Sequence, residues 1–199
     1  GHTGTVGRVV GTPGPYSWKN VAIVGGGYVP SVVFSPVEKD LLYMRTDMGG
    51  AYRWNPTDKT WIALTDWVGP DEWNYLGIES IAADPQDADT VYVAAGTYTN
   101  DWTSNNGQIL RSRDRGDSFE RFNLPFKVGG NMPGRSMGER LAIDPNLTST
   151  LYLGTRSGNG LWRSTDSGAT WSQVTAFPSA GDYAQDPTHT YGYASDRIG

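Results

Sequence analysis

The chain has 199 residues, among them 26 glycines, 12 prolines, 8 tryptophans and 11 tyrosines, and its formal net charge is −5. This length suits one domain with a sizeable core, and many turn-forming residues together with many aromatics favour an all-β fold. The acidic balance argues against nucleic acid, whose binders present a basic face, and it leaves a neutral ligand such as a sugar unhindered. Because cysteine is absent, the sequence excludes disulfides, a thiolate nucleophile and cysteine-ligated zinc.

The first segment, residues 1–15, reads GHTGTVGRVVGTPGP and has no apolar stretch, so we interpret it as a linker or a cloning remnant. No stretch of the sequence approaches the roughly 18 apolar residues of a membrane span. A signal peptide would already have been removed, and we expect a secreted, extracellular protein. Residues 16–199 are expected to form part of one β-propeller, for the reasons that follow.

Three segments of the chain resemble one another: VVFSPVEKDLLYM, IAADPQDADTVYV and LAIDPNLTSTLYL. Each contains a proline that is followed seven positions later by a tyrosine: Pro36 and Tyr43, Pro85 and Tyr92, Pro145 and Tyr152. A second pair of strand-like runs follows each segment, which predicts a four-stranded antiparallel unit. The prolines are about 50–60 residues apart, close to the repeat of a propeller blade with long loops. We therefore predict three blades, at about 31–64, 78–122 and 139–174.

Two of the units contain the Asp-box pattern S-x-D-x-G-x-[ST]-[WF] between their last two strands. The matching segments are SRDRGDSF (112–119) and STDSGATW (164–171), and NPTDKTW (55–61) is a degenerate copy. We interpret Asp114 and Asp166 as holding tight turns through side-chain to backbone hydrogen bonds, with Gly116 and Gly168 at positive φ. A calcium site is the alternative, but no D-x-D-x-D-G run supports it.

The segment WKNV (18–21) resembles WSQV (171–174), the last strand of the third unit, but it lacks the other three strands of a blade. Propellers often close their ring when an N-terminal strand completes the last blade, so this segment implies a C-terminal blade beyond these residues. By the spacing of the units, a fourth unit should begin shortly before the segment GYASDRIG. Because three blades cannot close a ring and would leave unpaired edges, we expect the N-terminal part of a longer protein.

Strand direction alternates within each unit, so the loops after the second and fourth strands lie at one end of the blade. The Asp boxes belong to the opposite end. The first end gathers the candidate site residues: Asp47, Tyr28, Trp67, Trp73, Tyr75, Tyr98, Trp102 and Arg135. Exposed aromatic clusters usually mark a binding surface. Flat rings with Asp, Asn and Arg between them suit a polysaccharide, although any single ring could instead pack a long loop onto its blade.

Asp47 stands in YMRTDMGGAYRW (43–54), directly before Met48-Gly49-Gly50. An Asp here can shape the turn by bonding the next amides, or it can act chemically. We expect the two glycines to turn the backbone away from the carboxylate and leave it open to water and substrate.

The ordered motifs YMRTDMGGAYRW, WNYLGIESIAADP, GNMPGR, GERLAIDP and SGNGLWRSTDSGATW together resemble glycoside hydrolase family 74, the xyloglucanases. The resemblance runs from about Trp18 to Tyr193. It implies two seven-bladed propellers that face one another across a cleft, the N-terminal one containing the three blades predicted here. It also implies an inverting endo-β-1,4-glucanase that acts on xyloglucan or a related β-glucan, although the loops that decide between mid-chain and chain-end cleavage lie partly beyond residue 199.

The same resemblance implies Asp47, in the family's R-T-D-x-G-G motif, as the general base. Inverting hydrolysis needs a second carboxyl group about 6.5–9.5 Å away that protonates the leaving oxygen. The family's general acid lies in the second propeller, and no residue of this chain matches it. We therefore expect this chain alone to be inactive, and its partners to be the polysaccharide and the C-terminal part of the same protein, with neither nucleic acid nor membrane.

We expect no cofactor and no metal site, because His2 and His189 are too far apart in the sequence to suggest one. Two other functions stay open: a non-catalytic carbohydrate-binding propeller, which would bind glucan through Trp67, Trp73 and Trp102 whatever the role of Asp47, and a protein-binding Asp-box propeller with no preference for sugar.

A sialidase is less favoured. It needs an arginine cluster with a catalytic Tyr and Glu, and no such constellation is evident around Arg45, Arg53, Arg135 and Arg140.

Overall fold

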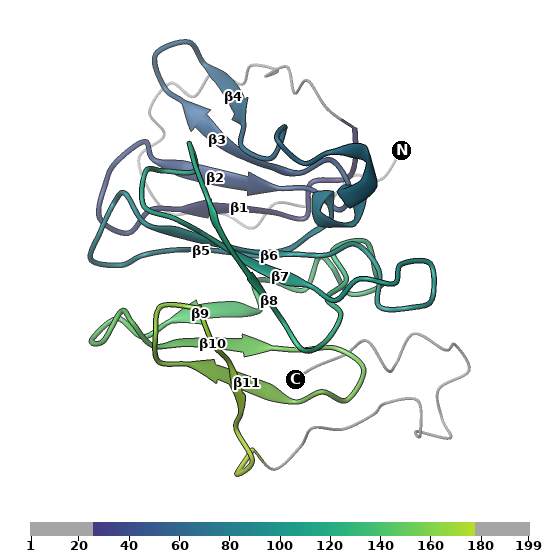
Figure 1. Cartoon of the computed structure of the whole chain (residues 1–199). Helices are drawn as coiled ribbons and strands as arrows, with labels where there is room; N and C mark the ends of the chain where they lie inside the picture. The colour runs from purple at the N-terminus through teal and green to yellow at the C-terminus, as the bar shows by residue number, and fades with distance from the viewer. Residues whose placement is uncertain (1–25, 178–199) are drawn as a thin grey trace, which may run out of the picture.

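The computed structural model describes residues 26–177 as three antiparallel sheets of four strands each (Figure 1). The first sheet contains β1 (Ser31–Phe34), β2 (Leu42–Arg45), β3 (Ala51–Asn55) and β4 (Thr60–Ala63). The second contains β5 (Ile78–Ala83), β6 (Val91–Ala95), β7 (Gln108–Ser112) and β8 (Glu120–Asn123). The third contains β9 (Leu141–Ile143), β10 (Leu151–Gly154), β11 (Leu161–Ser164) and β12 (Ser172–Gln173). A 3-10 helix, η1 (Pro70–Leu76), connects the first two sheets.

Within each sheet the strands are hydrogen-bonded in chain order, so each sheet is an up-and-down meander. The predicted all-β fold of four-stranded units is confirmed. The strand expected at 18–21 and the start of a fourth unit lie outside the described residues.

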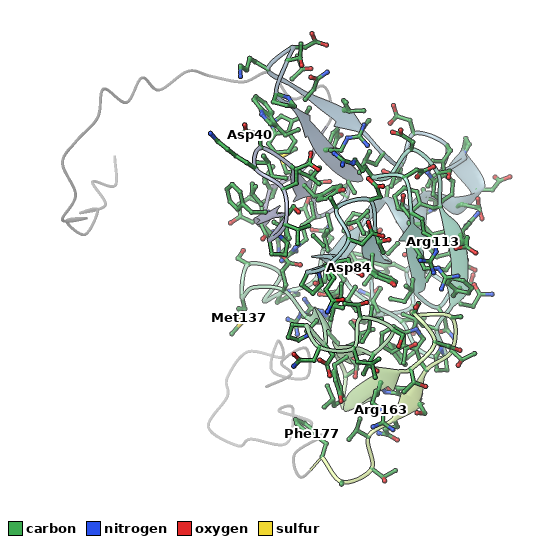
Figure 2. All side chains as sticks on the ribbon, turned by 90° about the vertical axis from the view of Figure 1, so that its left-hand side faces the viewer. Asp40, Asp84, Arg113, Met137, Arg163 and Phe177 are labelled. Atoms are coloured by element: carbon green, nitrogen blue, oxygen red, sulfur yellow. The ribbon has the colours of Figure 1, made fainter. Side chains whose placement is uncertain are left out.

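The proline-containing repeats form the turns between the first and second strands of each sheet. The residue before each proline accepts hydrogen bonds from the amides two and three positions later. These bonds join Ser35 Oγ to the amides of Val37 and Glu38 (3.3 Å each), Asp84 Oδ1 to those of Gln86 and Asp87 (2.8 and 3.0 Å), and Asp144 Oδ1 to those of Asn146 and Leu147 (2.8 and 3.3 Å). The side-chain oxygen replaces a backbone acceptor, which explains the recurring Ser/Asp-Pro pair. Figure 2 views the end of the sheets where these turns lie, with Asp84 labelled.

The Asp boxes close the same end of the second and third sheets with the predicted hydrogen bonds. Asp114 accepts from the Ser118 amide (2.8 Å), the Ser118 hydroxyl (2.5 Å) and the Ser112 hydroxyl (2.7 Å). These bonds, the one from the Ser118 hydroxyl first, lower the pKa of Asp114 to about 2 because they favour the charged carboxylate. Gly116 has a φ of +88°, as predicted. The second box repeats this arrangement with Asp166, Thr170, Ser164 and Gly168.

The apolar side chains form two cores, one on each face of the second sheet. On β6, Val91, Val93 and Ala95 face the first sheet, whereas Tyr92 and Ala94 face the third. Successive side chains of a strand point to opposite faces, so a strand covered on both faces is apolar throughout, and every residue of β6 is buried. The three sheets therefore pack face to face, and in Figure 1 they lie one below another with β5–β8 in the middle.

The first strands of the three sheets, β1, β5 and β9, lie next to one another. The sheets are thus arranged like propeller blades, with these strands on the inner side. In the described part of the chain, no helix is long and apolar enough to cross a membrane.

Candidate active site

Asp47 follows β2 in a turn that other residues shape. The Thr46 hydroxyl donates to the Gly50 carbonyl oxygen (2.7 Å) and accepts from the Gly49 amide (2.8 Å). A Cβ atom on Gly49 would lie 1.9 Å from the carbonyl oxygen of Gly26, so the segment that crosses here requires glycine. The Asp47 side chain bonds neither of the glycine amides. The turn is therefore built by Thr46 and the glycines, and the carboxylate is available for another role.

Two groups hold the Asp47 carboxylate. Its Oδ1 accepts a hydrogen bond from the Tyr28 amide (2.9 Å), and its Oδ2 lies 3.3 Å from Nε of Arg135 in an ion pair. Cζ of Arg135 also lies 5.4 Å from the centre of the Tyr28 ring, within the range of a cation–π contact. Only 7% of the Asp47 side chain is exposed. The expectation of an open carboxylate was wrong, because residues 26–28 and Arg135 cover most of it.

Arg135 lies in the connection between the second and third sheets, and the buried Arg45 fixes this connection. Arg45 donates through Nη2 to the carbonyl oxygens of Arg135 (3.0 Å) and Gly138 (3.1 Å), and its Nε pairs with Glu139 (2.7 Å). Arg45 is fully buried at the end of β2, two residues before Asp47. The end of β2 thus positions both the Asp47 carboxylate and the loop that carries the Arg135 guanidinium. Sequence reasoning missed this role, since it considered Arg45 only as a member of a sialidase cluster.

A second buried charge cluster holds the same connection. Glu79 of β5 is 2% exposed and pairs with Arg156 (2.8 Å) and Arg140 (3.0 Å), and it accepts a hydrogen bond from the Gly129 amide. Burial alone would raise the pKa of Glu79. The positive charge of Arg156 and the hydrogen bonds that Glu79 accepts from Arg156 and Gly129 favour the ionised form more strongly, so the pKa lies below its usual value. Arg156 also donates to the carbonyl oxygen of Pro133 (2.6 Å). Buried ions therefore bond the backbone of this connection at four positions, which are Gly129, Pro133, Arg135 and Gly138.

Three of the predicted aromatic residues form one group, which we call the aromatic platform: Trp73, Tyr98 and Trp102. The ring centre of Tyr98 lies 6.2 Å from that of Trp73 and 4.9 Å from that of Trp102, in edge-to-face contacts. Trp73 is 45% exposed and Trp102 is 71% exposed. Asn131 Nδ2 donates to the Tyr98 hydroxyl (2.9 Å) and lies 4.0 Å from the sulfur of Met48, the residue after the candidate base. Asn131 thus links the platform to Met48, the residue that follows Asp47, and the Asp47 carboxylate itself contacts none of the three rings.

Two predicted ligand-binding residues take other positions. Tyr75 of η1 is 7% exposed and belongs to the core between the first two sheets, which contradicts its expected place on the exposed face. Trp67 is 42% exposed but packs on Phe119 (ring centres 6.2 Å apart) and Arg121 (Cζ 5.0 Å from the ring centre), and its Nε1 donates to the Leu64 carbonyl oxygen (2.9 Å). Trp67 therefore anchors its loop to β8, as the packing alternative described.

The chain is 63% identical over 186 residues to a xyloglucanase of Paenibacillus sp, covering 93% of this chain and 18% of that protein. It is 50% identical over 196 residues to a xyloglucanase of Hypocrea jecorina, and this match covers 98% of this chain and 23% of that protein. Among solved structures, the GH74 xyloglucanase from Xanthomonas campestris matches with a TM-score of 0.75 and 55% identity over 82% of this chain and 23% of that chain. The Niastella koreensis GH74 enzyme matches with a TM-score of 0.70 and 43% identity, over 77% of this chain and 22% of that chain.

The chain belongs to family GH74. No family model matches it, so the assignment rests on these relatives and neighbours. It confirms the resemblance read from the motifs, and the solved GH74 structures confirm the prediction of β-propeller blades. The chain spans only 18% to 23% of the length of the GH74 relatives described above.

Within this GH74 chain, sequence reasoning missed three contributors to the site: Met48, Asn131 and Ser136. Asn131 bonds the Tyr98 hydroxyl, and the Ser136 hydroxyl lies 3.2 Å from that of Tyr28. The motif GNMPGR, which contains Asn131, was a usable signal, because a polar residue between two loop glycines has no core to fill. Ser136 and Met48 carried no comparable signal.

Proposed function

We propose that a complete GH74 protein containing this chain hydrolyses the β-1,4-glucan backbone of xyloglucan with inversion, and that Asp47 is its general base. The names of the relatives support the substrate class. The placement of Asp47 carries the proposal. Its carboxylate takes no part in shaping its own turn and is oriented by an amide and a guanidinium. The next residue, Met48, contacts Asn131, which bonds Tyr98 of the exposed aromatic platform.

The geometry supports a base that is held in one orientation. An ionised carboxylate offers about four lone-pair positions. The Tyr28 amide uses one, and Arg135 faces the other oxygen. The remaining positions are those that would take a proton from a water molecule about 2.6–3.2 Å away. The water attacks the anomeric carbon as a second acid, about 6.5–9.5 Å from Asp47, protonates the leaving oxygen. We assign that acid to a part of the protein outside this chain.

The platform supplies the proposed binding surface for the glucan. Trp73 and Trp102 expose flat rings on which the CH faces of sugar rings can stack, and Tyr98 between them fixes their positions. Polar side chains at the edge of the rings, among them Asn131, can bond the sugar hydroxyls. We also propose that the protein is secreted, because its proposed substrate is a polysaccharide too large to enter a cell.

The packing of the repeat tyrosines supports a longer propeller. Tyr43 and Tyr92 are each 1% exposed, because the next sheet along the chain covers them. Tyr152 occupies the same repeat position in the last described sheet and is only partly buried. We propose that a further blade covers it in the complete protein.

A non-catalytic carbohydrate-binding propeller is the second candidate, because a carboxylate that is only 7% exposed also suits a structural role. The deciding experiment is Asp47→Asn in the complete protein, with the exposed Asp66→Asn at the same end of the sheets as the control. If Asp47 is the base, kcat falls at least about 10²-fold while oligosaccharide affinity and melting temperature are retained. The control variant keeps its activity.

Two further readouts sharpen this test. Azide should restore turnover of the Asp47→Asn variant and give an α-glycosyl azide, because it replaces the missing base-activated water on the same face of the sugar. Nuclear magnetic resonance should show the α-anomer as the first product of the unmodified enzyme. Near-normal turnover by Asp47→Asn would return Asp47 to a structural role.

A further inference from the structure

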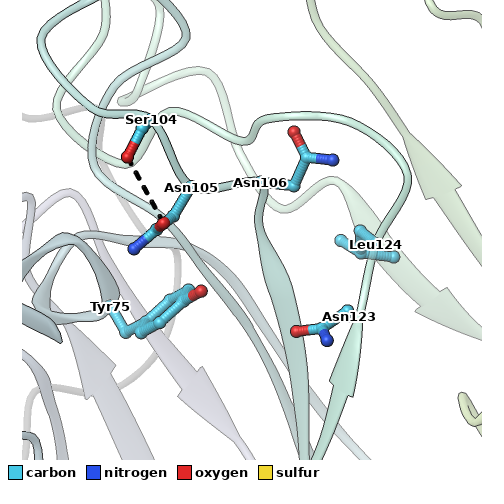
Figure 3. A pocket seen from close by; sticks show the side chains of 6 residues that line it. All are labelled: Tyr75, Ser104, Asn105, Asn106, Asn123 and Leu124. Carbon is cyan, nitrogen blue, oxygen red and sulfur yellow. Dashed lines mark hydrogen bonds between the residues drawn. The ribbon is translucent and has the colours of Figure 1, made fainter.

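The last described sheet carries a surface pocket that the mechanism above does not use. It has a volume of about 190 Å³ and is lined by Arg163 of β11 and by residues 172–176. It is separate from the pocket between the loop after β6 and the end of β8, which adjoins the aromatic platform (Figure 3). Figure 2 shows Arg163 on this sheet. Arg163 is exposed, and within residues 26–177 its side chain has no hydrogen-bond or ion-pair partner.

The repeat position of Arg163 is also an arginine in the first two sheets. Each of these arginines stands on the third strand of its sheet, directly opposite a tyrosine of the second strand. The three pairs are Arg53 with Tyr43, Arg111 with Tyr92, and Arg163 with Tyr152. Residues directly opposite one another on neighbouring strands project from the same face of the sheet. Tyr43 and Tyr92 face the next sheet along the chain, so the arginines paired with them face that sheet as well.

In the first two sheets, the arginine of the pair donates to the backbone of the Asp box in the next sheet. Nη1 of Arg53 donates to the carbonyl oxygen of Arg115, and Nη1 of Arg111 donates to that of Ser167 (2.8 Å). Arg115 and Ser167 stand directly before the glycine of their boxes, and their φ angles are +61° and +57°. Because the acceptor is a backbone oxygen at the same place in each turn, the contact does not depend on which side chain that residue carries.

The glycine of the box fits closely against the preceding sheet. A Cβ atom on Gly168 would lie 3.4 Å from Cε1 of Tyr92, and one on Gly116 would lie 2.7 Å from Cδ1 of Leu64. The Tyr92 hydroxyl also bonds Ser167. At the interface between the second and third sheets, the tyrosine therefore packs on the turn while the arginine holds the carbonyl oxygen before the glycine.

The third pair presents the same two groups on the far face of the third sheet. The arginine side chains of the first two pairs are 16% and 12% exposed, whereas Arg163 is exposed and Tyr152 is only partly buried. Leu151 and Leu153 belong to the core between the second and third sheets. Because neighbouring residues of a strand point to opposite faces, Tyr152 and Arg163 face away from that core, towards the position of a next sheet.

We propose that Tyr152 and Arg163 bind the Asp-box turn of a further blade in the complete protein, with the Arg163 guanidinium donating to the carbonyl oxygen before the box glycine. Two interfaces between sheets of this chain use the same contact, so the third continues an existing pattern. The chain spans only 18% to 23% of the length of its GH74 relatives. This inference rests on the further blade proposed above, and it identifies the contact that joins that blade to this chain.

The test places a photo-crosslinking amino acid at position 163 of the complete protein and identifies the attached peptide by mass spectrometry. The expected peptide is an Asp-box hairpin beyond residue 199. The same amino acid at position 111 should attach to the segment that contains Ser167. At position 113, where Arg113 is exposed, it should attach to no peptide. Attachment of position 163 to any other segment, to a second copy of the protein or to no peptide would overturn the proposal.

A second measurement avoids the bulky crosslinking group. Arg163→Met keeps an apolar side chain but removes the donors, so it should lower the melting temperature of the complete protein by about 3–6 °C, the effect of losing one hydrogen bond from a charged donor. Arg111→Met should lower it similarly, and Arg113→Met should not. If Arg163→Met melts like Arg113→Met, the proposed contact is wrong. The kcat test of Asp47 reports on the opposite end of the sheets, so either proposal can fail while the other stands.

Discussion

Replacing Glu79 by glutamine should destabilise the propeller strongly, because it leaves two buried cations without their anion. Glu79 Oε2 lies 2.8 Å from Nε of Arg156, and Glu79 Oε1 lies 3.0 Å from Nε of Arg140. The side chains of these arginines are 1% and 10% exposed, so water cannot replace the carboxylate. Glutamine has nearly the same shape and can still accept the hydrogen bond of the Gly129 amide. Its NH2 group would face the N–H donors of Arg156 and Arg140, so the substitution removes one acceptor together with the charge.

The expected size of the effect follows from this burial. Removing one partner of a buried ion pair costs about 3–5 kcal/mol, whereas an exposed pair is worth about 0–1 kcal/mol. A change of 3–5 kcal/mol is a large part of the roughly 5–15 kcal/mol that stabilise a typical domain. For a domain of this size or larger, about 2 °C of melting temperature is lost per kcal/mol. We therefore expect the propeller's thermal transition to fall by about 6–10 °C in Glu79→Gln.

Differential scanning calorimetry of the complete protein measures this shift. Glu120→Gln is the matched control, because Glu120 pairs with Arg111 at the same distance of 2.8 Å but is 56% exposed. The control should melt within about 2 °C of the unmodified protein. Equal melting temperatures for the two variants would refute the argument that burial gives the Glu79 cluster its importance.

Three further predictions concern a phenol, an Asp box and the tryptophans. The Tyr43 hydroxyl is buried without a hydrogen-bond partner in the described part of the chain. Tyr43→Phe should therefore raise the free energy of unfolding by about 1 kcal/mol. Tyr92→Phe is the control and should not raise it, because the Tyr92 hydroxyl loses a hydrogen bond to Ser167. The pKa of Asp114 is about 2 when folded and about 3.9 when unfolded. The ionised Asp114 therefore stabilises the folded state fully above about pH 4, and this stabilisation is lost as the pH falls towards 2. The melting temperature of Asp114→Ala should accordingly approach that of the unmodified protein over that range. Titration with oligosaccharide should show about tenfold weaker binding for Trp73→Ala, from a stacking loss of about 1–3 kcal/mol by analogy with base stacking. Trp67→Ala should lower the melting temperature only; a loss of affinity in that variant would contradict its packing role.

The repeats made the fold predictable because each repeated residue has a local physical task. The Ser/Asp-Pro pair closes one turn by bonding amides two and three positions ahead, and the Asp box closes another. Both tasks involve residues that are close in the sequence, so their spacing alone specifies them. The uninterrupted apolar run of β6 likewise reports burial on both faces.

Exposure in the candidate site was less predictable, because it depends on contacts between distant segments. Tyr75 and Trp73 stand two residues apart in η1, yet one is in the core and the other is exposed. Asp47 is covered by Tyr28 and Arg135, which are 19 and 88 positions away in the chain. No local pattern reports such contacts. The position of a loop relative to the blade end can be counted from the strands, whereas the direction of each side chain within it cannot.

The buried ions explain why a site built from long loops can still hold a carboxylate in one orientation. The connection that carries Arg135 has no strand or helix of its own, and loops of that kind are usually mobile. Here Arg45 bonds two of its carbonyl oxygens and Arg156 bonds a third, at Pro133. Each guanidinium is anchored by a glutamate, so the charges offset the cost of their own burial while they fix the backbone. The same ions that support the stability of the propeller therefore set the distance between Asp47 and Arg135, and a substitution that weakens one should disturb both.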